Sequence, residues 1–104
     1  MEFTETHEWL DLQGEIGTVG ITDHAQKELG EIVYVELPKI GQEVQKGQEI
    51  CVLESTKAAT DVYAPMSGTI VAVNEALRET PSKINEKAQS DGWLFQIRRP
   101  LVPN

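Results

Sequence analysis

The feature that most limits how this chain can fold is a series of short β-type segments, each ended by a turn residue. The strongest is residues 31–37 (EIVYVEL), which Pro38 ends because proline cannot donate to a strand ladder. The same reasoning predicts strands at residues 7–13, 16–21, 48–54, 60–64, 69–73 and 92–98. Many strands of this length with regular turns predict a small β-sandwich or barrel.

Short helices are expected between some of these strands. Thr22 or Asp23 can cap a helix that ends at Gly30, a residue suited to the C-terminal cap. A second helical turn is expected at residues 75–79, and Thr80–Pro81 predicts a further helix start, with proline in the first helical position. Helices this short are marginal alone, so we expect them to pack on the sheets.

Chain length limits the number of domains, and net charge limits the kinds of partner. A chain of 104 residues is expected to form one domain, residues 1–104. Nine basic against seventeen acidic residues give a net charge of −8, which disfavours nucleic acid as a partner. The charge suits docking onto basic protein surfaces, or it serves only solubility.

Other sequence features bear on the compartment. No segment is apolar enough to cross a membrane, and residues 1–5 resemble neither a signal nor a transit peptide. Cys51 is the single cysteine, so an internal disulfide is excluded and a reducing compartment is expected. It lies in an apolar run, which predicts a buried side chain rather than a reactive thiol.

Lys57 is the candidate functional residue. It lies between two predicted strands, in a turn that contains no Gly, Pro, Asn or Asp, and its side chain is expected in solvent. The small side chains of Ala58 and Ala59 leave space beside the amine for a modifying enzyme. Glu54 and Asp61 bracket the turn with negative charge, which disfavours a nucleophilic Schiff-base lysine. An ordinary solvated lysine is the alternative.

At this point the sequence resembles the H-protein family of the glycine cleavage system, whose members are lipoyl carriers. The resemblance rests on an ordered set of blocks: Thr6–Trp9, Gly20–Gln26, Leu29–Val33, Val35–Pro38, Glu54–Ala58, Tyr63–Pro65, Ser67–Gly68, Val73–Asn74 and Gly92–Leu94. Any one block is weak, but the set in this order is specific.

The resemblance implies a fold and a site. The fold would be a barrel-sandwich hybrid, a lipoyl- or biotinyl-carrier-like β-sandwich with short peripheral helices. Lys57 would carry lipoic acid in amide linkage, and Glu54 would help the attaching enzyme to recognise it. Gly41 and Gly68 occupy positions where lipoyl domains place glycines, sixteen residues before and eleven after the lysine.

The resemblance also implies a cleft for the loaded arm, lined by Thr6, Glu8 and Asp61. Carboxylates there could hold the cationic aminomethyl group by charge-assisted hydrogen bonds, and ordinary surface acids are the alternative. The implied partners are a pyridoxal-phosphate glycine decarboxylase, an aminomethyltransferase, dihydrolipoamide dehydrogenase and lipoate-attaching enzymes. The implied role is that of a non-catalytic carrier in the bacterial cytoplasm, or in the mitochondrial matrix if a presequence has been removed.

Two segments depart from the family pattern. The chain ends at Pro100–Asn104 where H proteins usually continue into a C-terminal helix, and residues 85–92 replace a Pro-Tyr-containing loop. These departures bear on partner docking rather than on lipoylation. They motivate an alternative in which an H-like protein relays lipoate or serves another redox system.

Other functions have weaker support. An enzyme or binding module with an unmodified Lys57 remains a hypothesis. A biotin carrier is disfavoured because biotin sites flank the lysine with methionine, whereas Thr56 and Ala58 do so here. His7 and His24 lack Cys or His partners at metal-ligand spacing, so capping or packing roles are expected.

Overall fold

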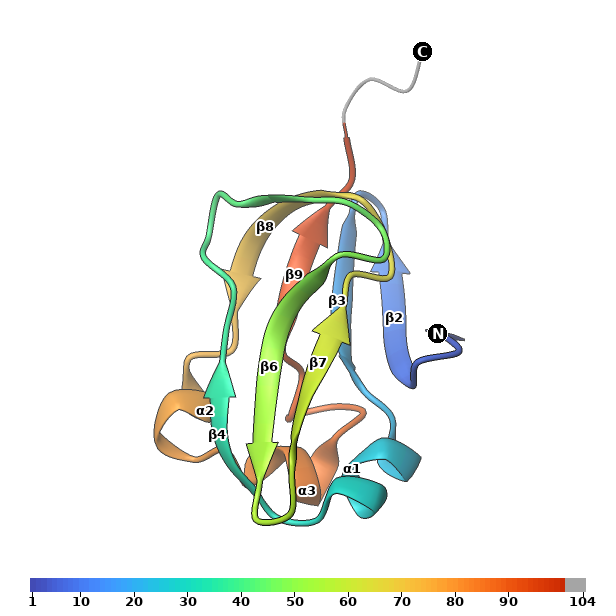
Figure 1. Cartoon of the computed structure of the whole chain (residues 1–104). Coiled ribbons are helices and arrows are strands. Elements are labelled where there is room, and N and C mark those ends of the chain that lie inside the picture. Colours follow the sequence, from blue (N-terminus) through green and yellow to red (C-terminus); the bar gives the residue numbers. More distant parts are fainter. Residues whose placement is uncertain (101–104) are drawn as a thin grey trace.

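Figure 1 shows a computed structural model of the chain, of which residues 1–100 are described. Residues 101–104, where the sequence was expected to depart from the family's C-terminal helix, lie outside this range. The strands of the described part are β1 (Glu2–Phe3), β2 (Glu8–Gln13), β3 (Ile16–Ile21), β4 (Ile32–Glu36), β5 (Glu43–Val44), β6 (Glu49–Ser55), β7 (Ala59–Tyr63), β8 (Gly68–Val73) and β9 (Phe95–Arg98). Its helices are α1 (Asp23–Leu29), α2 (Ala76–Glu79) and α3 (Lys83–Lys87).

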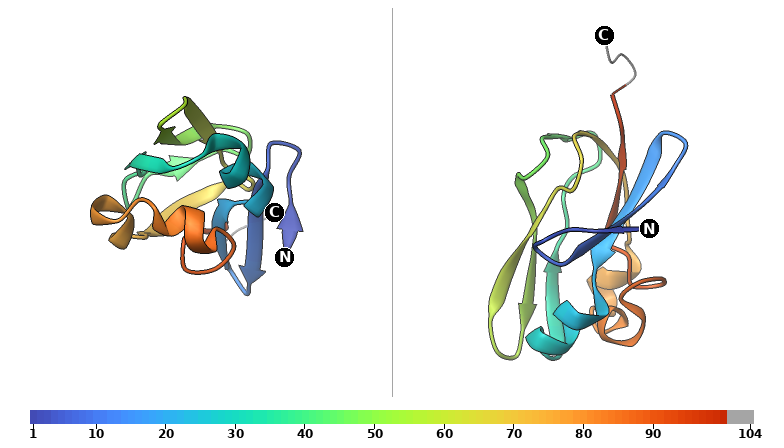
Figure 2. Two further views of the ribbon diagram at one scale, coloured as in Figure 1. Left: turned by 90° about the horizontal axis from the view of Figure 1, so that it is seen from below. Right: turned by 90° about the vertical axis from the view of Figure 1, so that its right-hand side faces the viewer.

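The strands form two antiparallel sheets, which confirms the predicted sandwich. One sheet has the order β1-β2-β3-β9-β8-β5, and the other has the order β4-β6-β7. Viewed from the side, the sheets are two layers, and α1 lies at the lower end (Figure 2, right). The β6–β7 hairpin therefore belongs to the smaller sheet and has its turn at that end (Figure 1).

Apolar side chains from both sheets fill the space between them. The largest fully buried ones are Phe95, Ile32, Leu53, Ile70, Leu77, Ile84, Leu94 and Ile97. Leu77 and Ile84 come from α2 and α3, so these short helices gain their stability by packing against the core, as expected. Cys51 is also buried, which confirms its predicted place in the core.

Helix α1 follows the sequence signals at both ends. The Thr22 hydroxyl accepts a hydrogen bond from the Ala25 amide at 3.1 Å, so Thr22 is the N-cap. Gly30 has a φ of 83° and donates its amide to the Gln26 carbonyl. A left-handed residue at this position favours glycine and ends the helix there.

The predicted helix start at Thr80–Pro81 is wrong. Helix α3 begins at Lys83, and its N-cap Ser82 makes no side-chain capping bond. The carbonyls of Thr80 and Pro81 instead accept three-residue turn bonds from Lys83 and Ile84, each at 3.1 Å. Proline thus opens a tighter turn that precedes the helix.

Three strand predictions need correction. The two-residue strands β1 and β5 were not expected, because two residues carry no alternation. β9 starts at Phe95 instead of Gly92. Gly92 packs against the backbone of α3, since a Cβ there would lie 2.9 Å from the Ile84 Cα. The chain therefore joins the sheet only after this contact.

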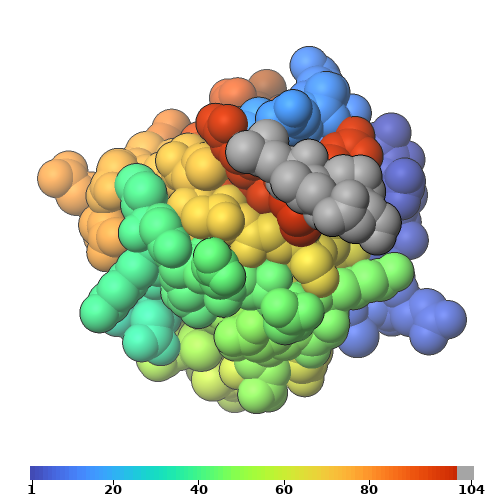
Figure 3. Space-filling model, turned by 90° about the horizontal axis from the view of Figure 1, so that it is seen from above, coloured from blue at the N-terminus to red at the C-terminus, as the bar shows by residue number. Residues whose placement is uncertain are grey.

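The two ends of the sandwich differ. The loop between β4 and β5, the start of β8 and the end of β9 gather at the end opposite the β6–β7 turn (Figure 3). Viewed from the turn end, α1 lies between the hairpin and α3 (Figure 2, left). The surroundings of Lys57 are therefore built by α1 and the segments that flank it.

Candidate functional site: an exposed lysine beside a cleft

The turn that carries Lys57 is shaped by Ser55, the last residue of β6. The Ser55 hydroxyl accepts hydrogen bonds from the amides of Lys57 at 3.0 Å and Ala58 at 3.1 Å, and it donates to the Ala58 carbonyl at 3.1 Å. A serine hydroxyl commonly closes a turn in this way. The turn is therefore specified by a residue just before it, which explains why Gly, Pro, Asn and Asp are not needed.

Lys57 is exposed, as predicted, but its stem has a defined neighbour. A Cβ on Gly30 would lie 3.3 Å from Cε of Lys57, so the stem runs across Gly30 at the end of α1. The next contact is made by the backbone, where the Thr56 amide donates to the Glu31 carbonyl at 3.1 Å. Within residues 1–100 the Lys57 amine forms no ion pair, and the residue is exposed to solvent.

A cleft of about 280 Å³ lies between α1, β7 and the loop before β2. We call it the α1 cleft. Its lining residues are Thr6, His7, Glu8, Ile21, His24, Ala25, Glu28, Leu29, Thr60, Asp61 and Val62. The structure thus brings Thr6, Glu8 and Asp61 together on one cleft, and β7, which forms one wall, begins two residues after Lys57.

Glu8 lines the cleft and is buried, with 2% of its surface exposed. One carboxylate oxygen accepts from the hydroxyls of Thr4 and of Thr6, the latter at 2.6 Å. The other accepts the Tyr63 amide at 3.1 Å, which ties β2 to the outer edge of β7. A buried carboxylate is tolerated when it is hydrogen-bonded in this way.

Asp61 also faces a second carboxylate. It borders a hollow on the outer side of the small sheet together with Glu36 and Glu49. Charge repulsion from Asp61, helped by a side-chain hydrogen bond with it, raises the pKa of Glu49. The outer face of the β6–β7 hairpin therefore carries two neighbouring carboxyl groups, Glu49 and Asp61, beside the cleft.

The remaining predicted residues lie elsewhere. Glu54 is exposed near the end of β6, opposite Ala59. Gly68 begins β8 and pairs with Val44, at the end of the sandwich away from the turn (Figure 1). A Cβ on Gly68 would lie 2.1 Å from the Arg98 carbonyl oxygen, so glycine is required by the close approach of β9.

Gly41 is at the same distant end as Gly68. Its amide donates to the Ile70 carbonyl at 2.7 Å, beside β5. Its φ of 95° is in the left-handed region that favours glycine, so the loop geometry accounts for this residue. The structure places Gly41 and Gly68 in the framework, where neither borders the α1 cleft.

Sequence reasoning missed the histidine pair on the cleft wall. The rings of His7 and His24 have centroids 5.1 Å apart and are tilted by 39°, which agrees with the packing role expected for them. His7 has a φ of 68°, and its carbonyl accepts the Thr22 backbone amide at 2.9 Å, which joins the loop before β2 to the N-cap of α1. The sequence did hold a signal for the wall that α1 forms: His24 and Glu28 are four residues apart and therefore lie on one face of the helix.

The described residues form neither a metal-binding cluster nor a membrane-spanning helix. Across residues 1–100, no three His, Cys, Asp or Glu side chains are grouped so that they could hold a metal ion. Over the same range, no helix has the length and apolar character needed to cross a membrane.

A two-sheet domain that presents one free lysine on an ordered hairpin, beside a polar cleft, has the form of a carrier protein. The family model described as Glycine cleavage H-protein matches residues 1–102. The Glycine cleavage system H protein of Thermotoga maritima is 52% identical over 96 residues, covering 92% of this chain and 77% of that protein. The corresponding protein of Beijerinckia indica is 55% identical over the same coverage.

A solved structure agrees with this result. The crystal structure of a glycine cleavage system H protein from Mycobacterium marinum superposes with a TM-score of 0.89 at 37% identity, covering 98% of this chain and 85% of that one. The chain therefore belongs to the glycine cleavage H-protein family, whose members are carrier subunits rather than catalytic enzymes. This confirms the resemblance and the carrier role expected from the sequence.

Proposed function

We propose that Lys57 carries lipoic acid in amide linkage, and that the loaded arm shuttles the aminomethyl group of glycine between the enzymes of the glycine cleavage system. The observation that carries this proposal is the position of Lys57. Its amine is exposed on a turn ordered by Ser55, and β7 leads from that turn directly into the α1 cleft. The one-domain organisation over residues 1–104 is part of the same proposal.

The residues present fit such a group. When attached, the lipoyl group supplies a disulfide that accepts the aminomethyl group and is reduced as it does so. Ala58 and Ala59 are exposed beside the amine and give an attaching enzyme access to it. Glu54, exposed on the same hairpin, offers that enzyme a carboxylate to recognise.

The α1 cleft supplies a place for the cationic cargo. A carboxylate has about four lone-pair sites, and three donors already occupy those of Glu8, so roughly one remains for a guest ammonium. Because these donors hold the carboxylate in place, binding needs little reorganisation. We propose that Glu8, Thr6 and Asp61 bind the cargo and that the cleft keeps it from water.

The partners follow from this role. A pyridoxal-phosphate glycine decarboxylase would load the arm, an aminomethyltransferase would unload it, and dihydrolipoamide dehydrogenase would reoxidise it. Tethering at Lys57 keeps the reacting end at a high effective concentration near each docked enzyme. We also propose the bacterial cytoplasm as the compartment, because the relatives named above are bacterial proteins.

Intact mass spectrometry tests the attachment. The full chain is incubated with lipoate, ATP and a lipoate ligase, alongside Lys57→Arg and Lys57→Ala variants. We expect the mass of one lipoyl group on the wild-type chain and on neither variant. Glycine cleavage reconstituted with the three partner enzymes should then be lost in Lys57→Arg.

Glu8→Gln separates attachment from storage of the cargo. This variant keeps the shape of the side chain but removes the negative charge, so we expect normal lipoylation and a shorter lifetime of the aminomethyl-loaded form. Lipoate-dependent glycine cleavage by Lys57→Arg would disprove the attachment site. A lipoylated protein that supports no glycine cleavage would favour the lipoate-relay alternative.

A further inference from the structure

The hairpin turn contacts Gly30 and Glu31, which join α1 to β4, and these two residues together with Ile32, the first residue of β4, are called the platform. The Thr56 amide binds the Glu31 carbonyl at 3.1 Å, and the stem of Lys57 crosses Gly30. Both the backbone beside Lys57 and the Lys57 side chain therefore take their position from the platform. A shift of the platform would move the amine.

A single side chain from α3 holds the platform on its opposite side. The Asn85 amide group donates to the Gly30 carbonyl at 2.8 Å, and its oxygen accepts the Ile32 amide, also at 2.8 Å. In extended backbone, the carbonyl of one residue and the amide two residues later point to the same side, while the carbonyl between them points to the other. Asn85 thus binds one side of the platform as a neighbouring strand would, and the Glu31 carbonyl faces Thr56.

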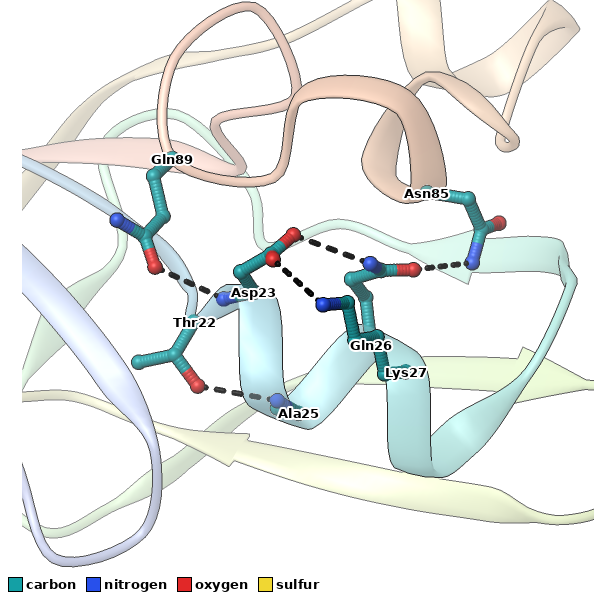
Figure 4. A network of polar contacts seen from close by, with 7 residues as sticks. All are labelled: Thr22, Asp23, Ala25, Gln26, Lys27, Asn85 and Gln89. Atoms are coloured by element: carbon teal, nitrogen blue, oxygen red, sulfur yellow. Dashed lines mark hydrogen bonds and ion pairs between the residues drawn. The ribbon is translucent and has the colours of Figure 1, made fainter.

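The same amide group is anchored in α1. The Asn85 side chain also donates to the Gln26 side-chain oxygen at 3.0 Å. The side-chain nitrogen of Gln26 in turn donates to the Asp23 carboxylate at 3.1 Å (Figure 4). Gln26 is buried and Asn85 is half-buried, while Asp23 is exposed at the outer end of the network. The side chain of Asn85 therefore has three hydrogen-bond partners at fixed places.

We propose that Asn85 is a positioning residue for lipoylation: by clamping the platform, it presents the Lys57 amine in the orientation that the attaching enzyme requires. This inference rests on the proposed attachment of lipoate to Lys57. The role needs a donor and an acceptor in one short side chain, a combination that asparagine has and that aspartate and leucine lack.

The test compares lipoylation kinetics of the full chain with those of Asn85→Ala and Asn85→Asp. The aspartate variant keeps the acceptor for Ile32 but loses the donor to Gly30, so it reports on the clamp even if Asn85→Ala fails to fold. Because a poorly held reactive group reacts more slowly, we expect kcat/KM for lipoylation to fall on the order of tenfold or more. Amide hydrogen exchange at Thr56 should become faster in both variants.

Gln89→Ala is the matched control. Gln89 lies in the turn that follows α3 and binds the start of α1, where its side-chain oxygen accepts the Asp23 backbone amide at 2.9 Å (Figure 4). Removing this bond loosens α1 but leaves the platform contacts intact. We expect wild-type lipoylation kinetics and unchanged exchange at Thr56.

Each outcome decides the question. Wild-type rates in both Asn85 variants would overturn the inference while leaving the proposed function intact, and an equal loss in Gln89→Ala would reduce Asn85 to a general structural role. Absence of lipoylation in the wild-type chain would overturn the proposed function together with the inference.

Discussion

Single side chains explain features of this protein that composition alone does not. Ser55 fixes the lysine turn because its hydroxyl accepts hydrogen bonds from two backbone amides. Glu8 joins β2 to β7 by a hydrogen bond between residues 55 apart in the sequence. Each works because a short polar group meets backbone donors that would otherwise lack partners. The chemistry of the exposed lysine thus depends on neighbours that carry no reactivity of their own.

Cys51 should be inert in the folded protein. Burial, with the nearby Glu36 charge, raises the pKa of the Cys51 thiol to about 12, so almost no thiolate forms at pH 8. We expect labelling by a thiol-specific disulfide reagent at pH 8 to be very slow in the native chain and fast in urea. Rapid labelling under native conditions would contradict the burial of this side chain.

Contacts between whole elements place the site. The platform between α1 and β4 holds the hairpin turn, α3 holds the platform, and the loop before β2 closes the α1 cleft against β7. None of these elements is long enough to be stable alone. Ser55 therefore sets the shape of the turn within the hairpin, and these packed neighbours set where the turn lies on the molecule.

Adjacent strands also produce a measurable pH effect. Because Asp61 raises the pKa of Glu49, the folded chain binds a proton there more readily than the unfolded chain. The repulsion therefore lowers stability at neutral pH and is relieved as the pH falls through the raised pKa.

Glu49→Gln should consequently raise Tm at pH 7, with a gain that shrinks toward zero in acid. Thermal unfolding followed by circular dichroism from about pH 3 to pH 8 would record this change in the range where carboxyl groups titrate. Glu15→Gln, in the β2–β3 turn, serves as the control with the same change in net charge. A gain for Glu49→Gln that is equal at both ends of the pH range would refute the mechanism.

Local signals predicted the elements well, and long-range contacts escaped prediction. The caps of α1 lie within a few residues of the helix they end, so Thr22 and Gly30 could be read from the sequence. Asn85 lies 53 residues from Ile32, and no periodicity connects them. The role of Ser55 was missed because its signal stands in the strand before the turn, and the start of α3 was misplaced because Pro81 suits both a helix and a tighter turn.

At the scale of the whole molecule, the excess of negative charge should guide association. With a net charge of −8, encounter with a partner of basic surface should be fast at low salt. We expect kcat/KM for lipoylation to fall several-fold between about 0.01 M and about 0.1 M NaCl, as the Debye length shortens from roughly 30 Å to roughly 10 Å.

A matched pair of variants tells local from global effects. Glu54→Gln removes a charge on the lysine hairpin, and Glu15→Gln removes one at the opposite end of the sandwich (Figure 1). Equal losses of rate would indicate a field of the whole molecule, and a larger loss in Glu54→Gln would indicate local recognition. A rate that does not respond to salt would show that the charge serves solubility alone.

The lysine turn and the α1 cleft share one end of the sandwich, while the other end is occupied by loops that make no contribution to the site. On the proposed function, the enzymes that load, unload and reoxidise the arm would all approach this one end and would compete for it. Delivery would then be a relay in which each partner leaves before the next arrives. An excess of one enzyme should then inhibit the others competitively in the reconstituted cycle.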